Sequence, residues 1–219
     1  RQWATRNLAE YMRKGFIMDD ERLKNPDGRS DYFDELLARI RDIRSSEKRF
    51  YQKVRDLFSL SSDYDSTDKA TQMFFAEAQN KLLFAVTRKT AAELILSRAD
   101  ARKLNMGLTN WKGSKVRKQD ITIAKNYLSA DELDSLNRLV VIFLEQAELR
   151  VKNQQDLTMG YWQSNLDKLL IFNEFPVLKT AGKISHSVME KKVRAHYVAY
   201  DNLRKREEAL EADRMEIEE

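Results

Sequence analysis

The stretch SADELDSLNRLVVIFLEQAELRVK, residues 129–152, decides the fold class. Ser129 and Glu132 have the spacing of a capping box, in which a hydroxyl and a carboxylate each accept a backbone N–H at the start of a helix. The richest apolar stretch of the chain follows, and its six-residue apolar run, Leu139–Leu144, cannot lie on one helix face. We therefore predict a central helix over 133–151 that is buried on most sides.

Apolar residues at spacings of three and four predict further helices on both sides of this one. Asp31 and Asp68 are candidate caps, and Thr90 with Glu93 repeats the capping-box spacing. Gly15 ends a first helical segment near the N-terminus. The other predicted helices cover 31–60, 68–86, 91–99, 159–173 and about 185 to the C-terminus.

The composition of the 219 residues agrees with an all-α fold. Six Gly and two Pro are too few for the turns of a strand-rich chain, and the absence of Cys excludes disulfides and thiolate metal sites. No apolar run approaches the roughly 18 residues that cross a bilayer, and residues 1–20 are too charged for a secretory signal. We expect a cytoplasmic protein with one multi-helix domain over 1–183 and a long C-terminal helix over 184–219.

The C-terminal helix also carries a heptad pattern, in which spacings of four and three alternate. Its positions are Met189, Val193, His196, Tyr200, Leu203, Glu207, Leu210, Arg214 and Ile217, and polar side chains occupy three of them. In one interpretation the helix packs on its own domain; in the other it pairs with a second copy of the chain to form a homo-oligomer. The candidate pairing residues are Met189, Val193, Tyr200, Leu203 and Leu210.

The sequence contains few of the residue patterns that are typical of catalytic or metal-binding sites. The two histidines, His186 and His196, are ten residues apart, so no metal-binding His pair exists on one helix turn. The contiguous acids Asp19, Asp20 and Glu21 lack the separate ligands that a metal site recruits. We expect no catalytic residue, metal or cofactor, and a metal-dependent nucleic-acid enzyme using these three acids is the least favoured alternative.

The basic residues are concentrated in one segment. Residues 81–125 contain eleven Lys or Arg against three acids, a net charge of +8, whereas the whole chain carries +4. Lysine and arginine in a Gly-bracketed loop are suited to phosphate oxygens. The candidate nucleic-acid-binding residues are Arg102, Lys103, Trp111, Lys112, Lys115, Arg117 and Lys118. In the competing interpretation, Trp111 is a core anchor and the cations are merely solvated.

Several long strings of the sequence resemble the RhuM family of bacterial virulence-associated proteins. They include GFIMDDERLKN (15–25), DYFDELL (31–37), RFYQKVR (49–55) and NMGLT (105–109). The similarity extends from residue 1 to about 182, and the final thirty-odd residues match less well. On this basis the chain is identified as the C-terminal two-thirds of a RhuM-like protein.

The resemblance implies a DNA-associated regulatory protein of genomic islands and mobile elements. Family members usually carry an N-terminal region resembling a helix-turn-helix domain, and we expect this chain to begin after it. Pairing through the C-terminal helix would then place two such regions on two half-sites of DNA. The rival from another class is a protein-interaction or effector module whose basic loop meets an acidic protein surface. We do not expect the protein to bind a membrane.

Overall fold

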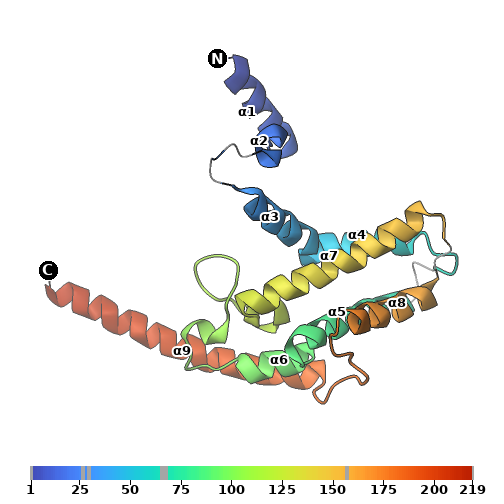
Figure 1. Ribbon diagram of the computed structural model, residues 1–219. Coiled ribbons are helices and arrows are strands. Elements are labelled where there is room, and N and C mark those ends of the chain that lie inside the picture. Colours follow the sequence, from blue (N-terminus) through green and yellow to red (C-terminus); the bar gives the residue numbers. More distant parts are fainter. Residues whose placement is uncertain (1, 26–27, 29–30, 65–68, 156–157, 219) are drawn as a thin grey trace. The chain divides into compact units, whose positions relative to one another are not determined.

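The computed structural model describes residues 2–25, 28, 31–64, 69–155 and 158–218, and every regular element in these ranges is a helix (Figure 1). The predicted all-α fold with a long C-terminal helix is confirmed. The chain divides into two compact units, residues 1–44 and 45–219, so the boundary predicted between 183 and 184 falls inside the second unit. Among the described helices, none has the length and apolarity needed to cross a membrane.

The first unit contains α1 (Gln2–Lys14), α2 (Asp20–Lys24) and most of α3 (Phe33–Ser45). Gly15 ends α1 as predicted, with φ +82°, and Asp31 accepts a hydrogen bond from the backbone N–H of Phe33 at 2.8 Å, as expected of a cap. None of the described side chains between residues 2 and 44 is buried. The helices of this unit therefore form without a hydrophobic core of their own.

The predicted continuous helix over 31–60 is wrong. The structure has two helices there, α3 and α4 (Glu47–Phe58), separated at Ser46, whose backbone is extended with φ −57° and ψ 136°. Serine is better suited to a helix end than to a helix interior, because its hydroxyl competes for backbone hydrogen bonds. The apolar periodicity continues across the Ser45–Ser46 pair, which is why it concealed the break.

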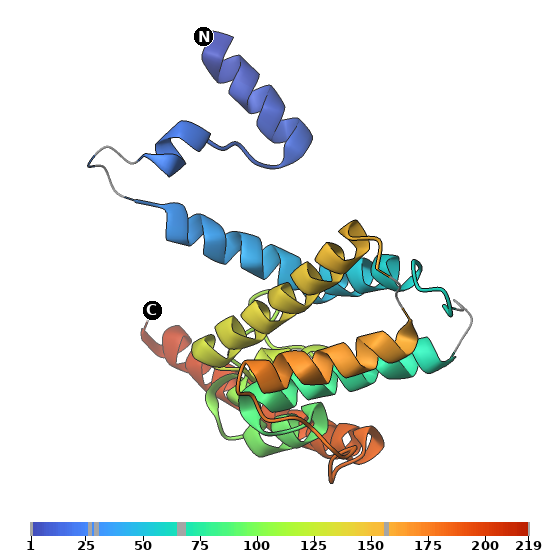
Figure 2. The same ribbon diagram turned by 45° about the vertical axis from the view of Figure 1, so that its right-hand side comes forward.

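The core of the second unit lies between α4, α5 (Lys69–Thr87), α7 (Ala130–Lys152) and α8 (Met159–Phe172). Helix α7 packs against α4 and α5, and α5 packs against α8 (Figure 2). Trp162 is fully buried, with its Nε1 donating to Ser61 Oγ at 2.9 Å and its ring centroid 5.9 Å from that of Phe143. The predicted helices over 68–86, 133–151 and 159–173 are confirmed, whereas Asp68 lies outside the described residues.

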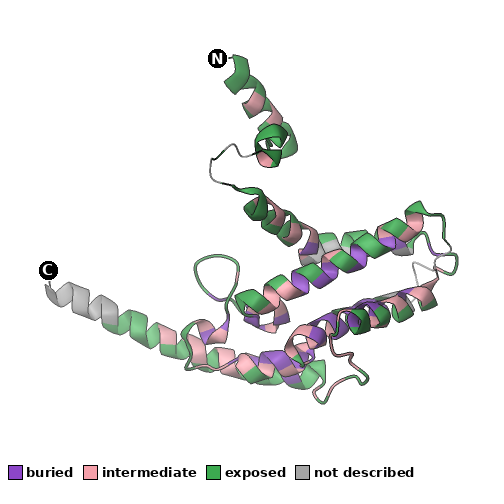
Figure 3. Ribbon diagram, viewed as in Figure 1, coloured by how far each residue is buried: buried purple, intermediate pink, exposed green. Residues whose placement is uncertain are grey.

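Seven of the 23 residues of α7 are buried, and Figure 3 shows exposed as well as buried stretches along this helix. Leu139, Val140, Phe143 and Leu144 are all buried, whereas Ile142 in the same run is exposed. The capping box of Ser129 with Glu132 at its start is present, as predicted. The buried residues recur at spacings of three and four and form one face of α7, so the predicted burial on most sides is wrong.

Helix α9 (His186–Glu218) packs against α6 (Ala91–Arg98), which begins with the predicted Thr90–Glu93 capping box. Between α6 and α7 the chain forms only three short 3₁₀ turns: η1 (Leu104–Gly107), η2 (Asp120–Thr122) and η3 (Ala124–Tyr127). This irregular segment, residues 99–129, contains the basic residues that the sequence analysis singled out.

Candidate nucleic-acid interface

The irregular segment is held at its two ends by an ion pair between α6 and α7. Arg98 donates to both carboxylate oxygens of Glu132, each at 2.6 Å, and also to the Tyr127 carbonyl. Glu132 in turn accepts the backbone N–H of Ser129 at 2.8 Å. The hydrogen bonds from Arg98, followed by those from Ser129, lower the pKa of Glu132 to about 2. Arg98 is therefore a structural cation of the fold.

A left-handed turn follows the end of α6. Asn105, Met106 and Gly107 all have positive φ, at 51°, 58° and 80°, and the Met106 side chain is fully buried. A Cβ atom on Gly107 would lie 2.5 Å from the Arg98 carbonyl oxygen, so only glycine fits here. The backbone accepts this strained conformation because the turn inserts Met106 into the core and docks against the end of α6.

Hydrogen bonds close a neck beneath the loop that Figure 1 shows standing out between α6 and α7. The backbone N–H of Thr109 donates to the Asn126 carbonyl at 2.8 Å, and its hydroxyl donates to the Leu128 carbonyl at 2.6 Å. Within the neck, the buried Tyr127 hydroxyl donates to the Ile121 carbonyl at 3.0 Å. These contacts fix where the loop leaves the helical body and where it returns.

We use the term basic loop for residues 102–118. Trp111 in this loop is half-buried and packs against the hydrophobic core, and its Nε1 is buried without an acceptor among the described residues. Val116 is buried, and its carbonyl accepts the Tyr197 hydroxyl of α9 at 3.4 Å. Trp111 is thus positioned as an anchor of the loop, and a direct role in binding nucleic acid stays a prediction.

The structure separates the cations of the basic segment into two groups. Some are engaged by nearby acids: Lys81 contacts Asp167 at 2.8 Å, Arg102 contacts Asp100 at 3.4 Å, and Lys115 contacts Glu208 at 2.7 Å. In the basic loop, four further cations are exposed and have no ion pair within the described part of the chain: Lys103, Lys112, Arg117 and Lys118.

The contact between Lys115 and Glu208 links the basic loop to α9. Arg204 also donates to Glu208, at 3.2 Å, and all three side chains lie on the surface or partly so. The hydrogen bond from Lys115 lowers the pKa of Glu208. An exposed pair of this kind contributes little to stability, so it opens at low cost when a stronger anion competes for Lys115.

The candidate pairing residues of α9 divide into an inner and an outer set. Met189 and Val193 are buried in the core of the second unit, and Tyr200 is half-buried. Leu203 and Leu210 are 41% and 63% exposed. The side chains of Arg214 and Ile217, the last two positions of the pattern, lie outside the described part of the chain. His196 lies toward the domain, with its Nδ1 3.1 Å from the Ala99 carbonyl oxygen. The first half of the heptad pattern therefore packs against the second unit itself.

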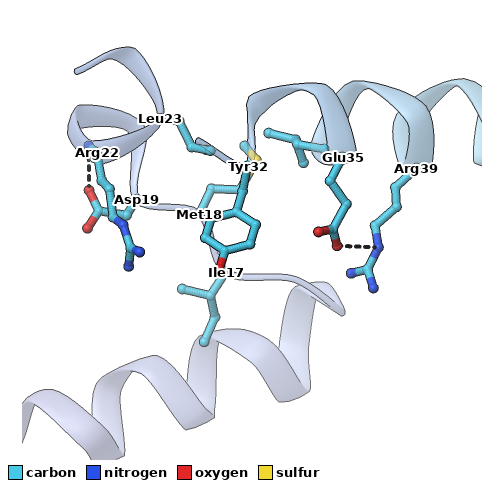
Figure 4. A pocket seen from close by; sticks show the side chains of 9 residues that line it. Ile17, Met18, Asp19, Arg22, Leu23, Tyr32, Glu35 and Arg39 are labelled. Carbon is cyan, nitrogen blue, oxygen red and sulfur yellow. Dashed lines mark hydrogen bonds and ion pairs between the residues drawn. The ribbon is translucent and has the colours of Figure 1, made fainter. Parts of the chain in front are cut away.

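Asp19, the first of the contiguous acids of the first unit, lines a pocket of about 370 Å³ (Figure 4). Asp19 caps α2 by accepting the Arg22 backbone N–H at 3.1 Å, and the Glu35 carboxylate on α3 faces Arg39 at 3.5 Å. Tyr32 lies between these pairs, with the Arg22 guanidinium 6.0 Å from its ring centroid. Among the residues that the structure describes, no group of three or more His, Asp or Glu side chains is placed to hold a metal ion.

The sequence did not indicate two features of the irregular segment. The acids that form ion pairs with Arg98 and Lys115 lie 34 and 93 residues further along the chain, so no local sequence pattern predicts these pairs. The left-handed turn is signalled only by Gly107, since neither Asn105 nor Met106 requires a positive φ. A count of charges in one segment therefore overestimated the cations that remain accessible.

Comparison with known proteins identifies the family of the chain. The family model described as "Virulence protein RhuM family" matches residues 1–209. Because this match covers nearly the whole chain, the chain belongs to the RhuM family. No match is found among curated proteins or among solved structures.

Proposed function

We propose that this RhuM-family chain contacts the phosphate backbone of DNA through Lys112, Arg117 and Lys118 of the basic loop, and that it does so without catalysing a reaction. The observation that carries the proposal is the exposure of these three cations, none of which has an ion pair among the described residues. Lys103 lies on the same loop and adds a fourth charge. Phosphate contacts of this kind position a protein on DNA without reading its sequence.

The anchoring of the loop supports the same proposal. Thr109 ties the neck of the loop, while Trp111 and Val116 hold its inner side against the core. A loop fixed in this way loses little conformational entropy when it binds, so more of the electrostatic attraction appears as affinity. Trp111 then acts by positioning the neighbouring Lys112 rather than by stacking on a base.

Lys115 takes part in a different manner, because Glu208 already neutralises it. We expect a DNA phosphate to compete with the Glu208 carboxylate for the Lys115 ammonium. The variant Glu208→Gln removes the competing charge while keeping the shape of the side chain. It should therefore bind DNA more tightly and steepen the salt dependence by about 0.9 in logarithmic slope, the value for one additional phosphate contact.

Salt-titrated binding to random duplex DNA tests the proposal. Replacing Lys112, Arg117 and Lys118 together with Ala should flatten the logarithmic salt slope by about 2.7, since each phosphate contact contributes about 0.9. The control replaces three exposed lysines outside the basic loop, Lys152, Lys168 and Lys179, and so removes the same net charge. Equal flattening in both triple variants would show that only the overall charge matters and would refute the assignment.

The two rival functions give different outcomes. Absence of DNA binding at low salt, together with binding of the basic loop to an acidic protein, would favour an interaction module. Cleavage of nucleic acid in the presence of Mg²⁺ or Mn²⁺, abolished in a variant with Asp19, Asp20 and Glu21 replaced by Asn or Gln, would favour an enzyme. Intact nucleic acid after prolonged incubation supports the non-enzymatic proposal.

We further propose that the outer part of α9 pairs with a second copy of the chain. Leu203 and Leu210 carry this proposal, because they are exposed apolar residues seven positions apart on one helix face. Met189 and Val193 are excluded from the pairing surface by their burial. Light scattering should show a dimer that Leu203→Glu with Leu210→Glu converts to the 25.7 kDa monomer. Val198→Glu, at an exposed position outside the heptad pattern, is the control; a monomer in the unmodified protein would refute the pairing.

A further inference from the structure

Leu104 lies in the basic loop as the first residue of η1, directly after Arg102 and Lys103. Its side chain is 86% exposed, which is more than any other large hydrophobic residue in the described part of the chain. A leucine that stays in water adds almost nothing to the hydrophobic core, so the fold itself does not account for an apolar group at this position. The loop therefore presents an apolar tip beside two cations.

Backbone hydrogen bonds close the turn that carries Leu104. The Lys103 N–H donates to the Asp100 carbonyl at 3.1 Å, the Met106 N–H donates to the Lys103 carbonyl at 2.9 Å, and the Asp100 N–H donates to the Met106 carbonyl at 3.3 Å. Two residues beyond Leu104, the Met106 side chain is fully buried, and Gly107 packs directly against the end of α6. The exposed leucine is thus mounted on a backbone that is held from both sides.

The turn over residues 99–107 contains two cations, Arg102 and Lys103, against one acid, Asp100. The Asp100 carboxylate accepts the Arg102 backbone N–H at 3.0 Å and the Arg102 Nε at 3.4 Å, and these hydrogen bonds lower the pKa of Asp100. The charge of Lys103 lowers the same pKa by less, and Lys103 forms no ion pair in the part of the chain that the structure describes. The turn therefore keeps a net positive charge beside its apolar tip.

We propose that Leu104 acts as an apolar wedge, which inserts between two stacked base pairs of duplex DNA and kinks the helix axis. The inference rests on the proposed function, in which Lys112, Arg117 and Lys118 of the same loop hold the phosphate backbone. Wedges of Leu, Phe, Ile or Met recur in proteins that bend DNA, and the contacts that bent DNA makes offset the cost of unstacking. Because backbone hydrogen bonds and buried Met106 fix the turn, little conformational entropy is lost when Leu104 inserts.

Binding of the full chain to two short duplexes, one fully paired and one with a central mismatch, tests the wedge. A mismatched pair is easier to unstack, so the full chain should bind that duplex at least about tenfold more tightly than the paired one. Leu104→Ala removes the wedge at an exposed position and should reduce the preference to less than about twofold. The logarithmic salt slope of this variant should stay unchanged, because Leu104 contacts no phosphate. Leu104→Phe should retain the preference, since it supplies another apolar wedge.

Leu149→Ala is the matched control and should keep the mismatch preference, because Leu149 is 59% exposed in the last turn of α7, whereas the irregular segment leads into the first turn. Energy transfer between dyes at the ends of the paired duplex should show a kink of at least about 20° with the unmodified chain and none with Leu104→Ala. DNA binding without the mismatch preference or without the kink, or a preference that survives in Leu104→Ala, would refute the wedge and leave the phosphate contacts standing. Absence of binding to both duplexes would refute both proposals.

Discussion

Residues 2–44 and residues 99–129 show opposite relations between backbone regularity and burial. The first region is largely helical, yet none of its described side chains is buried, and Trp3 is 71% exposed. The second region has only three short 3₁₀ turns, yet it inserts Met106, Ile121 and Tyr127 fully into the core. Regular hydrogen bonding and tertiary packing are thus separate sources of order in this chain.

The comparison indicates where the unfolding free energy resides. A short helix in water gains little from its own hydrogen bonds, and most helical stability in proteins comes from packing of an apolar face. The irregular segment obtains that packing through anchors spaced along the loop, with the Arg98–Glu132 pair at its ends. We therefore expect substitutions in 99–129 to cost more stability than matched substitutions in 2–44.

Removing an isoleucine side chain from each region should give the largest difference. Ile121 is fully buried, whereas Ile17 is 48% exposed. Ile121→Ala should lower the free energy of unfolding by about 3 kcal/mol, since it leaves a cavity in the core. Ile17→Ala should change it by less than about 0.5 kcal/mol. Urea unfolding followed by circular dichroism measures both, and comparable losses in the two variants would contradict the difference in packing.

The ion pairs of the two regions should differ by a smaller amount. Arg98 and Glu132 form a bidentate pair whose side chains are 31% and 21% exposed, whereas Arg39 and Glu35 are 76% and 58% exposed. Arg98→Met should cost about 2 kcal/mol, because it leaves a half-buried carboxylate without its partner. Arg39→Met should cost about 0–0.5 kcal/mol. Equal losses of unfolding free energy in the two variants would mean that the fold does not depend on the Arg98–Glu132 ion pair between α6 and α7.

Low pH should weaken the same ion pair between Arg98 and Glu132. The pKa of Glu132 lies at about 2 in the folded chain, below its ordinary value of 4.5, because Arg98 and Ser129 hydrogen-bond to the carboxylate. Its contribution to stability is therefore complete above pH 4.5 and is lost as pH falls towards about 2. Between about pH 5 and pH 3, the free energy of unfolding should fall less steeply in Arg98→Met than in the unmodified chain. Parallel pH profiles would exclude this source of acid sensitivity.

The contrast between local helix signals and tertiary packing explains how much of the structure could be predicted from the sequence. Helical spacing and capping boxes located α6, α7 and α8 closely, because both signals are local. The break at Ser46 was missed, since apolar periodicity runs through it. Local charge counting located the basic loop, but the partners of Arg98 and Lys115 come from distant helices. Which cations remain accessible is a property of tertiary structure, and so is the division of the α9 pattern into buried Val193 and exposed Leu203.

The smallest expected difference concerns two glycines with nearly the same backbone conformation. Gly15 and Gly107 have φ of +82° and +80°, so alanine at either position should cost about 1 kcal/mol in the left-handed region. At Gly15 a Cβ atom meets nothing within 4 Å, whereas at Gly107 it lies 2.5 Å from the Arg98 carbonyl oxygen. Gly107→Ala should therefore cost about 1 kcal/mol more, because the turn must move off the end of α6. Hydrogen exchange of nearby amides gives the local opening free energy in each region. A cost at Gly107 no larger than at Gly15 would show that this turn is less tightly packed than its buried Met106 indicates.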